Sequence, residues 1–164
     1  MKRIGILTGG GDCPGLNAVI RAAARTLIRD HDLEVVGIQL GFEGLLTKSI
    51  VPLTLESIRG ILPKGGTLLR TTNRGNPFEY PAPGGGVEDR SQKVVDNIHE
   101  LGIDGSIPIG GDGTLRIAQR LCELGIPMVA VPKTIDNDLA ATDYTFGFHT
   151  AVAVATDAVD RLHT

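Results

Sequence analysis

The chain has no tryptophan, and aromatic residues make up only 4% of its 164 residues. Its two cysteines, Cys13 and Cys122, show neither a CxxC motif nor a zinc-ligand spacing, so neither a disulfide scaffold nor a zinc site is expected. Basic residues are not in excess, and a net charge of −3 argues against nucleic acid or an anionic membrane as the main partner. No apolar run is long enough to span a membrane and no signal-peptide pattern is present, so we expect a cytoplasmic protein.

Glycine is abundant instead, with 22 residues that mostly interrupt alternating strand-like and helix-like segments. Short β-branched apolar runs favour buried parallel strands, and amphipathic runs between them favour covering helices. We therefore predict an α/β fold, a doubly wound three-layer sandwich with a mostly parallel sheet, in a single domain spanning 1–164. The expected strands are 3–8, 34–39, 105–109 and 128–131, and the expected helices are 16–30, 55–61, 87–101, 114–124 and 149–162.

The most informative motif is Gly110-Gly-Asp-Gly-Thr114, which directly follows the strand-like run 105–109. Glycines let backbone N–H groups approach phosphate oxygens, and the positive end of the following helix would face the anion. Asp112 is a candidate ligand for the Mg²⁺ that accompanies a polyphosphate. The alternative is a tight turn in which Asp112 caps the helix.

Two other loops follow probable strands in the same way, Gly9–Gly15 and Pro132–Asp138. Cys13 lies in the first of them near a helix start, which could make its thiol reactive, although a structural role is favoured. Because open α/β sheets bind ligands at the carboxyl ends of their strands, we expect these loops to share one site.

Two common nucleotide-binding motifs are absent. No GxxxxGK[ST] sequence occurs, and a GxGxxG reading from Gly9 fails at Pro14. Phosphoryl transfer remains, which needs a carboxylate to accept a proton from the attacking hydroxyl. Asp136 and Asp138 are the candidates; in an extended loop they would point to the same side and repel, raising the pKa of one of them.

Phosphoryl transfer also needs cations near the transferred group. Lys133, Arg70 and Arg74 lie in or beside the candidate loops. Solvation at the surface is the alternative role for each of them.

Together these motifs resemble the N-terminal half of the 6-phosphofructokinase family. The resemblance runs from Arg3 to His163 and rests on segments 9–17, 65–67, 110–114, 132–138 and 142–148. The GGDGT motif alone also occurs in NAD kinases and lipid kinases, but the segments 9–17 and 132–138 do not belong to them.

The resemblance implies transfer of a phosphoryl group from Mg²⁺-bound ATP to the 1-hydroxyl of fructose 6-phosphate, a step of glycolysis. It implies that Asp136 is the general base and that Asp112 binds Mg²⁺, with Asp138 and Arg161 of second rank. The residues implied for the phosphate donor are Gly11, Arg74, Gly75, Gly111, Asp112, Gly113 and Thr114, and those for the sugar phosphate are Thr134, Ile135 and Asp136.

Donor choice is expected to depend on Gly113 and Lys133. Family members that use pyrophosphate carry aspartate at the position of Gly113, so glycine indicates ATP. Lys133 matches the pyrophosphate enzymes instead. Because family lineages that combine this glycine and this lysine generally use ATP, we predict ATP, with pyrophosphate as the alternative donor.

Some positions depart from the family pattern. Arg70 replaces a usual glycine, which leaves room for a changed donor contact. Arg21 and Arg25 match effector-binding arginines of members activated by a purine nucleotide, but the third position is His163, so activation by ADP is not expected.

The resemblance also implies a second, substrate-binding domain beyond this chain and a homo-oligomer, dimer or tetramer, in the full-length form. We therefore expect residues 1–164 to be a donor-binding domain that is inactive alone. A catalytically silent nucleotide-binding module is the alternative.

Overall fold

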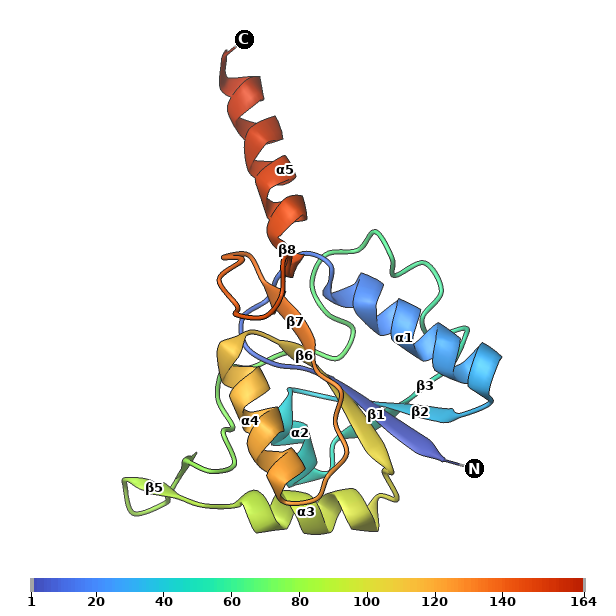
Figure 1. The fold of residues 1–164 in the computed structure, drawn as a ribbon, viewed down its shortest axis with the longest axis vertical. Coiled ribbons are helices and arrows are strands. Elements are labelled where there is room, and N and C mark those ends of the chain that lie inside the picture. The colour runs from blue at the N-terminus through green and yellow to red at the C-terminus, as the bar shows by residue number, and fades with distance from the viewer. Residues whose placement is uncertain (1, 164) are drawn as a thin grey trace.

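The computed structural model describes residues 2–163, and of His163 only the backbone. The strands are β1 (Arg3–Thr8), β2 (Glu34–Ile38), β3 (Ile50–Leu53), β4 (Tyr80–Pro81), β5 (Val87–Glu88), β6 (Gly105–Gly110), β7 (Val131–Thr134) and β8 (Phe146–Gly147). The helices are α1 (Leu16–His31), α2 (Phe42–Thr47), α3 (Ser91–Glu100), α4 (Asp112–Glu123), α5 (Phe148–Asp160) and a 3₁₀ turn, η1 (Arg161–His163) (Figure 1).

The main sheet has the strand order β3-β2-β1-β6-β7-β8. Its pairs are parallel except for β3, which runs antiparallel to β2 at the edge. Ile6 of β1 lies at the centre, paired with Gly37 on one side and Ile107 on the other. The predicted mostly parallel sheet is therefore confirmed, whereas the antiparallel edge strand was not expected.

Helices cover both faces of the sheet, as Figure 1 shows, with α1 on one side and α2, α3 and α4 on the other. Successive strand residues point to opposite faces, so Ile6 packs with Leu16 and Ile20 of α1, while Leu7 belongs to the other core. The predicted three-layer sandwich is confirmed.

The helix expected at 55–61 is wrong, because the segment forms only turns. The hydrogen bonds that usually start a helix are present. The Thr54 amide donates to Ser57 Oγ at 2.8 Å, and the Ser57 amide donates to Thr54 Oγ1 at 3.1 Å. Gly60 then adopts a φ of 73°, which ends the turn before a helix can propagate. Ile58 is nevertheless buried in the α1-side core.

The helix expected at 87–101 begins later, at Ser91. Val87 pairs with Pro81 in the small β4–β5 hairpin, and the Asp89 carboxylate accepts a hydrogen bond from the Ser91 amide at 2.8 Å. The short helix α2 was not predicted, because its six residues are too few to show a helical repeat.

The strand expected at 128–131 is displaced toward the C-terminus. Met128 makes only an isolated bridge to Ser106, and β7 begins at Val131. The strand therefore includes Pro132 and Lys133, which the sequence had placed in a loop. A proline is tolerated because β7 lies near the end of the sheet, where it pairs only briefly with β6.

Helix α5 extends away from the sheet (Figure 1), and none of its residues is buried. Val152 and Val154 of its apolar stripe are 48% and 62% exposed. None of the helices in residues 2–163 is both long enough and apolar enough to cross a membrane.

Candidate functional site at the switch point of the sheet

The candidate site lies where the strand order reverses. β1 and β6 are neighbours, but the chain proceeds from β1 toward β2 and from β6 toward β7, so the loops after β1 and β6 diverge and leave a crevice. A cleft of about 810 Å³ lies there. It brings together all the residues predicted for the donor, the sugar phosphate and donor choice: Gly11, Arg74, Gly75, Gly111, Asp112, Gly113, Thr114, Lys133, Thr134, Ile135 and Asp136.

The loop after β1 is held in place by backbone hydrogen bonds. The Gly9 amide donates to Ile109 O at 2.9 Å, and the Gly10 amide donates to Thr72 O at 3.1 Å. Gly10 has a φ of 80°, a conformation that favours glycine. A Cβ at Gly11 would meet no atom within 4 Å, so this position is open on the cleft side.

The loop after β6 is much shorter, since α4 begins at Asp112 directly after its N-cap residue Gly111. Thr114 is buried against both glycine loops: a Cβ at Gly9 or Gly110 would lie only 2.5 or 2.4 Å from Thr114 Oγ1. The loop after β1 therefore approaches Thr114 closely because Gly9 carries no side chain, and the missing side chain of Gly110 leaves room for Thr114 within its own segment.

Asp112 does not cap the helix, so that alternative is wrong. It is the first helical residue, and its Oδ2 accepts a hydrogen bond from Arg116 Nε at 2.7 Å, one turn along α4. The carboxylate is exposed at the cleft, beside the open position at Gly113. It is thus available to a ligand that enters at the helix N-terminus.

Lys133 lies beneath the loop that follows β1, only 4% exposed, and its Nζ donates to Gly11 O at 2.5 Å. Burial lowers the pKa of the Lys133 amine. Cys13 is also buried, which raises the pKa of its thiol and agrees with a structural role. Its Sγ contacts Phe146 O at 3.7 Å, and a Cβ at Gly147 would lie 2.0 Å from this sulfur.

The end of β7 carries the residues predicted for the sugar phosphate. Asp136 Oδ2 lies 3.2 Å from Thr134 Oγ1, and the Asp136 amide donates to the same hydroxyl at 3.1 Å. The extended conformation expected through Asp136 and Asp138 is wrong, because Asn137 between them has a φ of 51°. Asp138 does not line the cleft, whereas the exposed Asp136 does.

Two arginines near the donor side differ in position. Arg74 lines the cleft, whereas Arg70 does not. Arg70 has a φ of 58° and its carbonyl accepts a hydrogen bond from Thr8 Oγ1 at 2.8 Å. This left-handed conformation suits the glycine that the family pattern has at this position, and arginine there costs on the order of 1 kcal/mol.

The remaining arginines of the sequence analysis lie elsewhere. Arg161 pairs with Asp157 at the end of α5, 2.9 Å apart. Arg21 and Arg25 are one turn apart on α1. The side chain of His163, at the third effector position, lies outside the described residues. The expectation that ADP does not activate the protein therefore stays a prediction.

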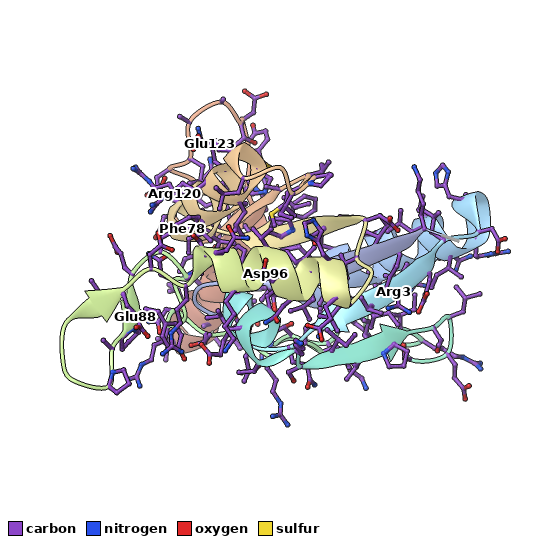
Figure 2. All side chains as sticks on the ribbon, turned by 90° about the horizontal axis from the view of Figure 1, so that it is seen from below. Arg3, Phe78, Glu88, Asp96, Arg120 and Glu123 are labelled. Carbon is purple, nitrogen blue, oxygen red and sulfur yellow. The ribbon has the colours of Figure 1, made fainter. Side chains whose placement is uncertain are left out.

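Sequence reasoning missed the far part of the cleft, which α2, α4 and the segment around Asn76 line. Arg116 and Arg120 belong to it and follow Asp112 at helical spacing, a signal that was available. The Arg120 guanidinium lies 3.7 Å from the centre of the Phe78 ring, and Figure 2 shows the two side by side. This contact fixes the side chain at the cleft wall.

The carboxylates of the cleft do not form a metal-binding cluster by themselves, and no group of three or more ligating side chains was found in residues 2–163. Such a cluster is unnecessary for Mg²⁺, which commonly takes one or two carboxylates, waters and phosphate oxygens. A single exposed carboxylate at Asp112 fits that chemistry.

Residues 3–164 match the family model described as Phosphofructokinase. An ATP-dependent 6-phosphofructokinase of Chloroflexus aggregans is 55% identical over 99% of this chain and 46% of its own length. A pyrophosphate–fructose 6-phosphate 1-phosphotransferase of Amycolatopsis mediterranei is 54% identical over 99% of this chain and 45% of its own length.

Among solved structures, phosphofructokinase from Saccharomyces cerevisiae superposes with a TM-score of 0.81 and 29% identity, over 99% of this chain and 24% of that one. The chain thus spans about half the length of the curated relatives it matches. The match over nearly all of its residues, on the fold and cleft described above, makes the chain a member of the phosphofructokinase family.

Proposed function

We propose that the chain is the donor-binding part of an ATP-dependent 6-phosphofructokinase, which transfers a phosphoryl group to the 1-hydroxyl of fructose 6-phosphate and yields fructose 1,6-bisphosphate. One observation carries the proposal: the glycine loops of β1 and β6 and the acidic loop of β7, far apart in sequence, line one cleft at the switch point. Backbone amides, a helix N-terminus and a nearby carboxylate are the parts that phosphoryl transfer requires.

On the donor side, the amides around Gly11, Gly111 and Gly113 bind the phosphates, and Arg74 neutralises their charge. Asp112 would hold Mg²⁺, which would supply positive charge against the negative charge of the phosphates. The open space beside Gly11 and Gly113 supports this role, since a ligand can approach both backbones closely.

On the acceptor side, Asp136 removes the proton from the sugar hydroxyl, which makes its oxygen a better nucleophile. Thr134 and Ile135 contact the sugar phosphate. The hydrogen bonds between Thr134 and Asp136 support a positioning of the carboxylate at the mouth of the cleft.

ATP is the proposed donor. The first turn of α4 has open space at Gly113, where aspartate would place a negative charge beside an incoming α-phosphate. The relatives at 54–55% identity include both an ATP-dependent and a pyrophosphate-dependent enzyme by name, so pyrophosphate remains the second candidate. Lys133, which lines the cleft and matches the residue of the pyrophosphate enzymes, is the observation that favours it.

The proposal places the other sugar-phosphate contacts in a second domain and the active enzyme in a cytoplasmic homo-oligomer, dimer or tetramer. The exposed face of α5 supports further contacts around this region. Residues 1–164 alone then bind the donor but do not turn it over.

The test has two parts. Binding of MgATP and of magnesium pyrophosphate to the chain is measured by isothermal titration calorimetry. Turnover is measured by ³¹P NMR on the chain joined to the second half of the Chloroflexus aggregans relative, with each donor and fructose 6-phosphate. Formation of fructose 1,6-bisphosphate with ATP supports the proposal; turnover only with pyrophosphate supports the second candidate. Donor binding without any turnover supports a silent nucleotide-binding module.

A further inference from the structure

Asn17 is an unusual residue for its place in the fold. It lies in the first turn of α1, only 5% exposed, on the helix face that otherwise buries Leu16, Val19 and Ile20. An amide buried in an apolar core is unfavourable unless its donors and acceptors are paired.

The side-chain amide of Asn17 forms hydrogen bonds with the segment 64–68, which is far away in sequence. Its Nδ2 donates to Lys64 O at 3.1 Å and to Gly65 O at 3.2 Å, and its Oδ1 accepts from the Leu68 amide at 2.7 Å. All of these partners are backbone atoms, so the side chain holds the path of the segment 64–68 and not one particular side chain in it. Both a donor and an acceptor are needed, which an amide provides.

The same loop continues toward the donor-binding residues. Thr67 Oγ1 lies 3.0 Å from Thr8 Oγ1, and the Thr71 hydroxyl contacts Thr8 O at 3.2 Å and Gly10 O at 2.6 Å. The Gly10 amide in turn donates to Thr72 O. A continuous set of hydrogen bonds therefore connects Asn17, through 64–72, to the loop that follows β1.

This connection ends at residues of the cleft. Gly10 and Thr72 both line it, and Arg74 follows with its amide bonded to Thr72 Oγ1 at 3.0 Å. Asn17 itself lies outside the cleft. Any effect of Asn17 on the phosphate donor must therefore pass through the loop.

We propose that Asn17 is a positioning residue for the phosphate donor: its amide fixes the segment 64–72, and this segment places Gly10, Gly11 and Arg74 for phosphate binding. The inference rests on the proposed function, since it concerns the donor of that same site. It assigns a role to an asparagine that lies outside the cleft.

The chain offers a matched control in Asn97. This asparagine is also buried, at 4% exposure, on helix α3, and its Nδ2 donates to Leu45 O at 2.7 Å and Leu46 O at 3.1 Å. Asn17→Asp and Asn97→Asp each place a carboxylate oxygen against two carbonyl oxygens without a change of size. Both should lower the thermal midpoint, but only Asn17→Asp should weaken MgATP binding, by about tenfold in Kd.

A second pair of variants tests the far end of the connection if Asn17→Asp does not fold. Thr71→Val removes the hydroxyl that contacts Gly10 O, whereas Thr71→Ser keeps it. We expect weaker MgATP binding in Thr71→Val and binding close to that of the unsubstituted chain in Thr71→Ser. Equal Kd values for Thr71→Val and Thr71→Ser would overturn the proposal.

Hydrogen exchange at the Gly10 amide separates this inference from the proposed function. Faster exchange in Asn17→Asp than in Asn97→Asp supports the positioning role. If the unsubstituted chain nevertheless binds neither MgATP nor magnesium pyrophosphate, the proposed function is wrong while Asn17 still positions the loop. If the unsubstituted chain binds MgATP and both asparagine variants bind it equally well, the positioning role is wrong while the proposed function stands.

Discussion

The two walls of the cleft are built differently. The wall around β1 and β6 consists of glycine loops closed on the buried Thr114, with a packed core on each face of the sheet behind it. The wall at the end of β7 is more exposed: Ile135, which lines the cleft, is 50% accessible, and outside the cleft Tyr144 is 63% accessible and α5 buries none of its residues. We call the first wall the donor wall and the second the acceptor wall, after their proposed roles. The donor wall is closely packed, whereas the acceptor wall leaves apolar surface exposed.

The largest effect is expected from Asp136→Asn. Removal of the proposed general base should lower kcat about 10²–10⁴-fold in the chain joined to a relative's second half. Donor affinity of the chain itself should not change, because the residue lies on the other wall. Steady-state kinetics and calorimetry measure the two quantities, with Asp138→Asn as the control outside the cleft. An equal loss of kcat in Asp138→Asn would remove the distinction between them.

A substitution at Gly110 tests how closely the donor wall is packed. Gly110→Ala brings a Cβ to within 2.4 Å of Thr114 Oγ1 and should lower the free energy of unfolding by about 1–3 kcal/mol. Gly11→Ala is the matched control, because no atom lies within 4 Å of its Cβ. Urea denaturation compares the two variants. Similar free energies for both would mean that Gly110 is not closely packed on Thr114.

The donor preference of this wall can be sharpened with Gly113→Asp. A Cβ there meets nothing within 4 Å and acidic residues are favourable in the first turn of a helix, so thermal stability should not fall. The added charge should raise the Kd for MgATP about tenfold and leave magnesium pyrophosphate less affected. Calorimetry with both donors measures the change, and unchanged ATP affinity would contradict the assignment of ATP.

The smallest effect concerns Lys133, which joins the two walls. Because burial lowers the pKa of its amine below 10.5, the unfolded chain binds more protons than the folded chain between the two pKa values. The free energy of unfolding should therefore rise with pH through that window, relative to Lys133→Met. Cys13, whose raised pKa acts in the opposite sense above 9.0, is present in both proteins. Denaturation curves at several pH values test this, and parallel pH profiles would contradict it.

The donor wall could be predicted well from sequence because its signals are local. The apolar strands predicted at 3–8 and 105–109, the glycines after them and the amphipathic helices that follow are contiguous patterns, and the structure confirms their positions within a few residues. The close approach of Gly9 to Thr114 could not be predicted, because it is a contact between segments about 100 residues apart.

The acceptor wall was predicted less well. β7 contains Pro132 and the buried Lys133, and a proline followed by a lysine is more typical of a loop than of a strand. Only the structure shows that Gly11 O accepts a hydrogen bond from this lysine. The turn at Asn137 depends on its amide oxygen accepting from the Thr145 amide at 2.9 Å, a contact that no periodicity reveals. The far part of the cleft was missed for the same reason, since its residues meet only in the folded chain.

The contact between Cys13 and Gly147 has a mechanical consequence. Gly147 immediately precedes α5, and the absent side chain lets the helix start directly against the loop that follows β1. A helix of 13 residues is about 20 Å long, so a tilt of about 5° at Gly147 moves its far end by about 2 Å. A displacement of the loop after β1 that tilted α5 by this amount would therefore be enlarged at the far end of the helix.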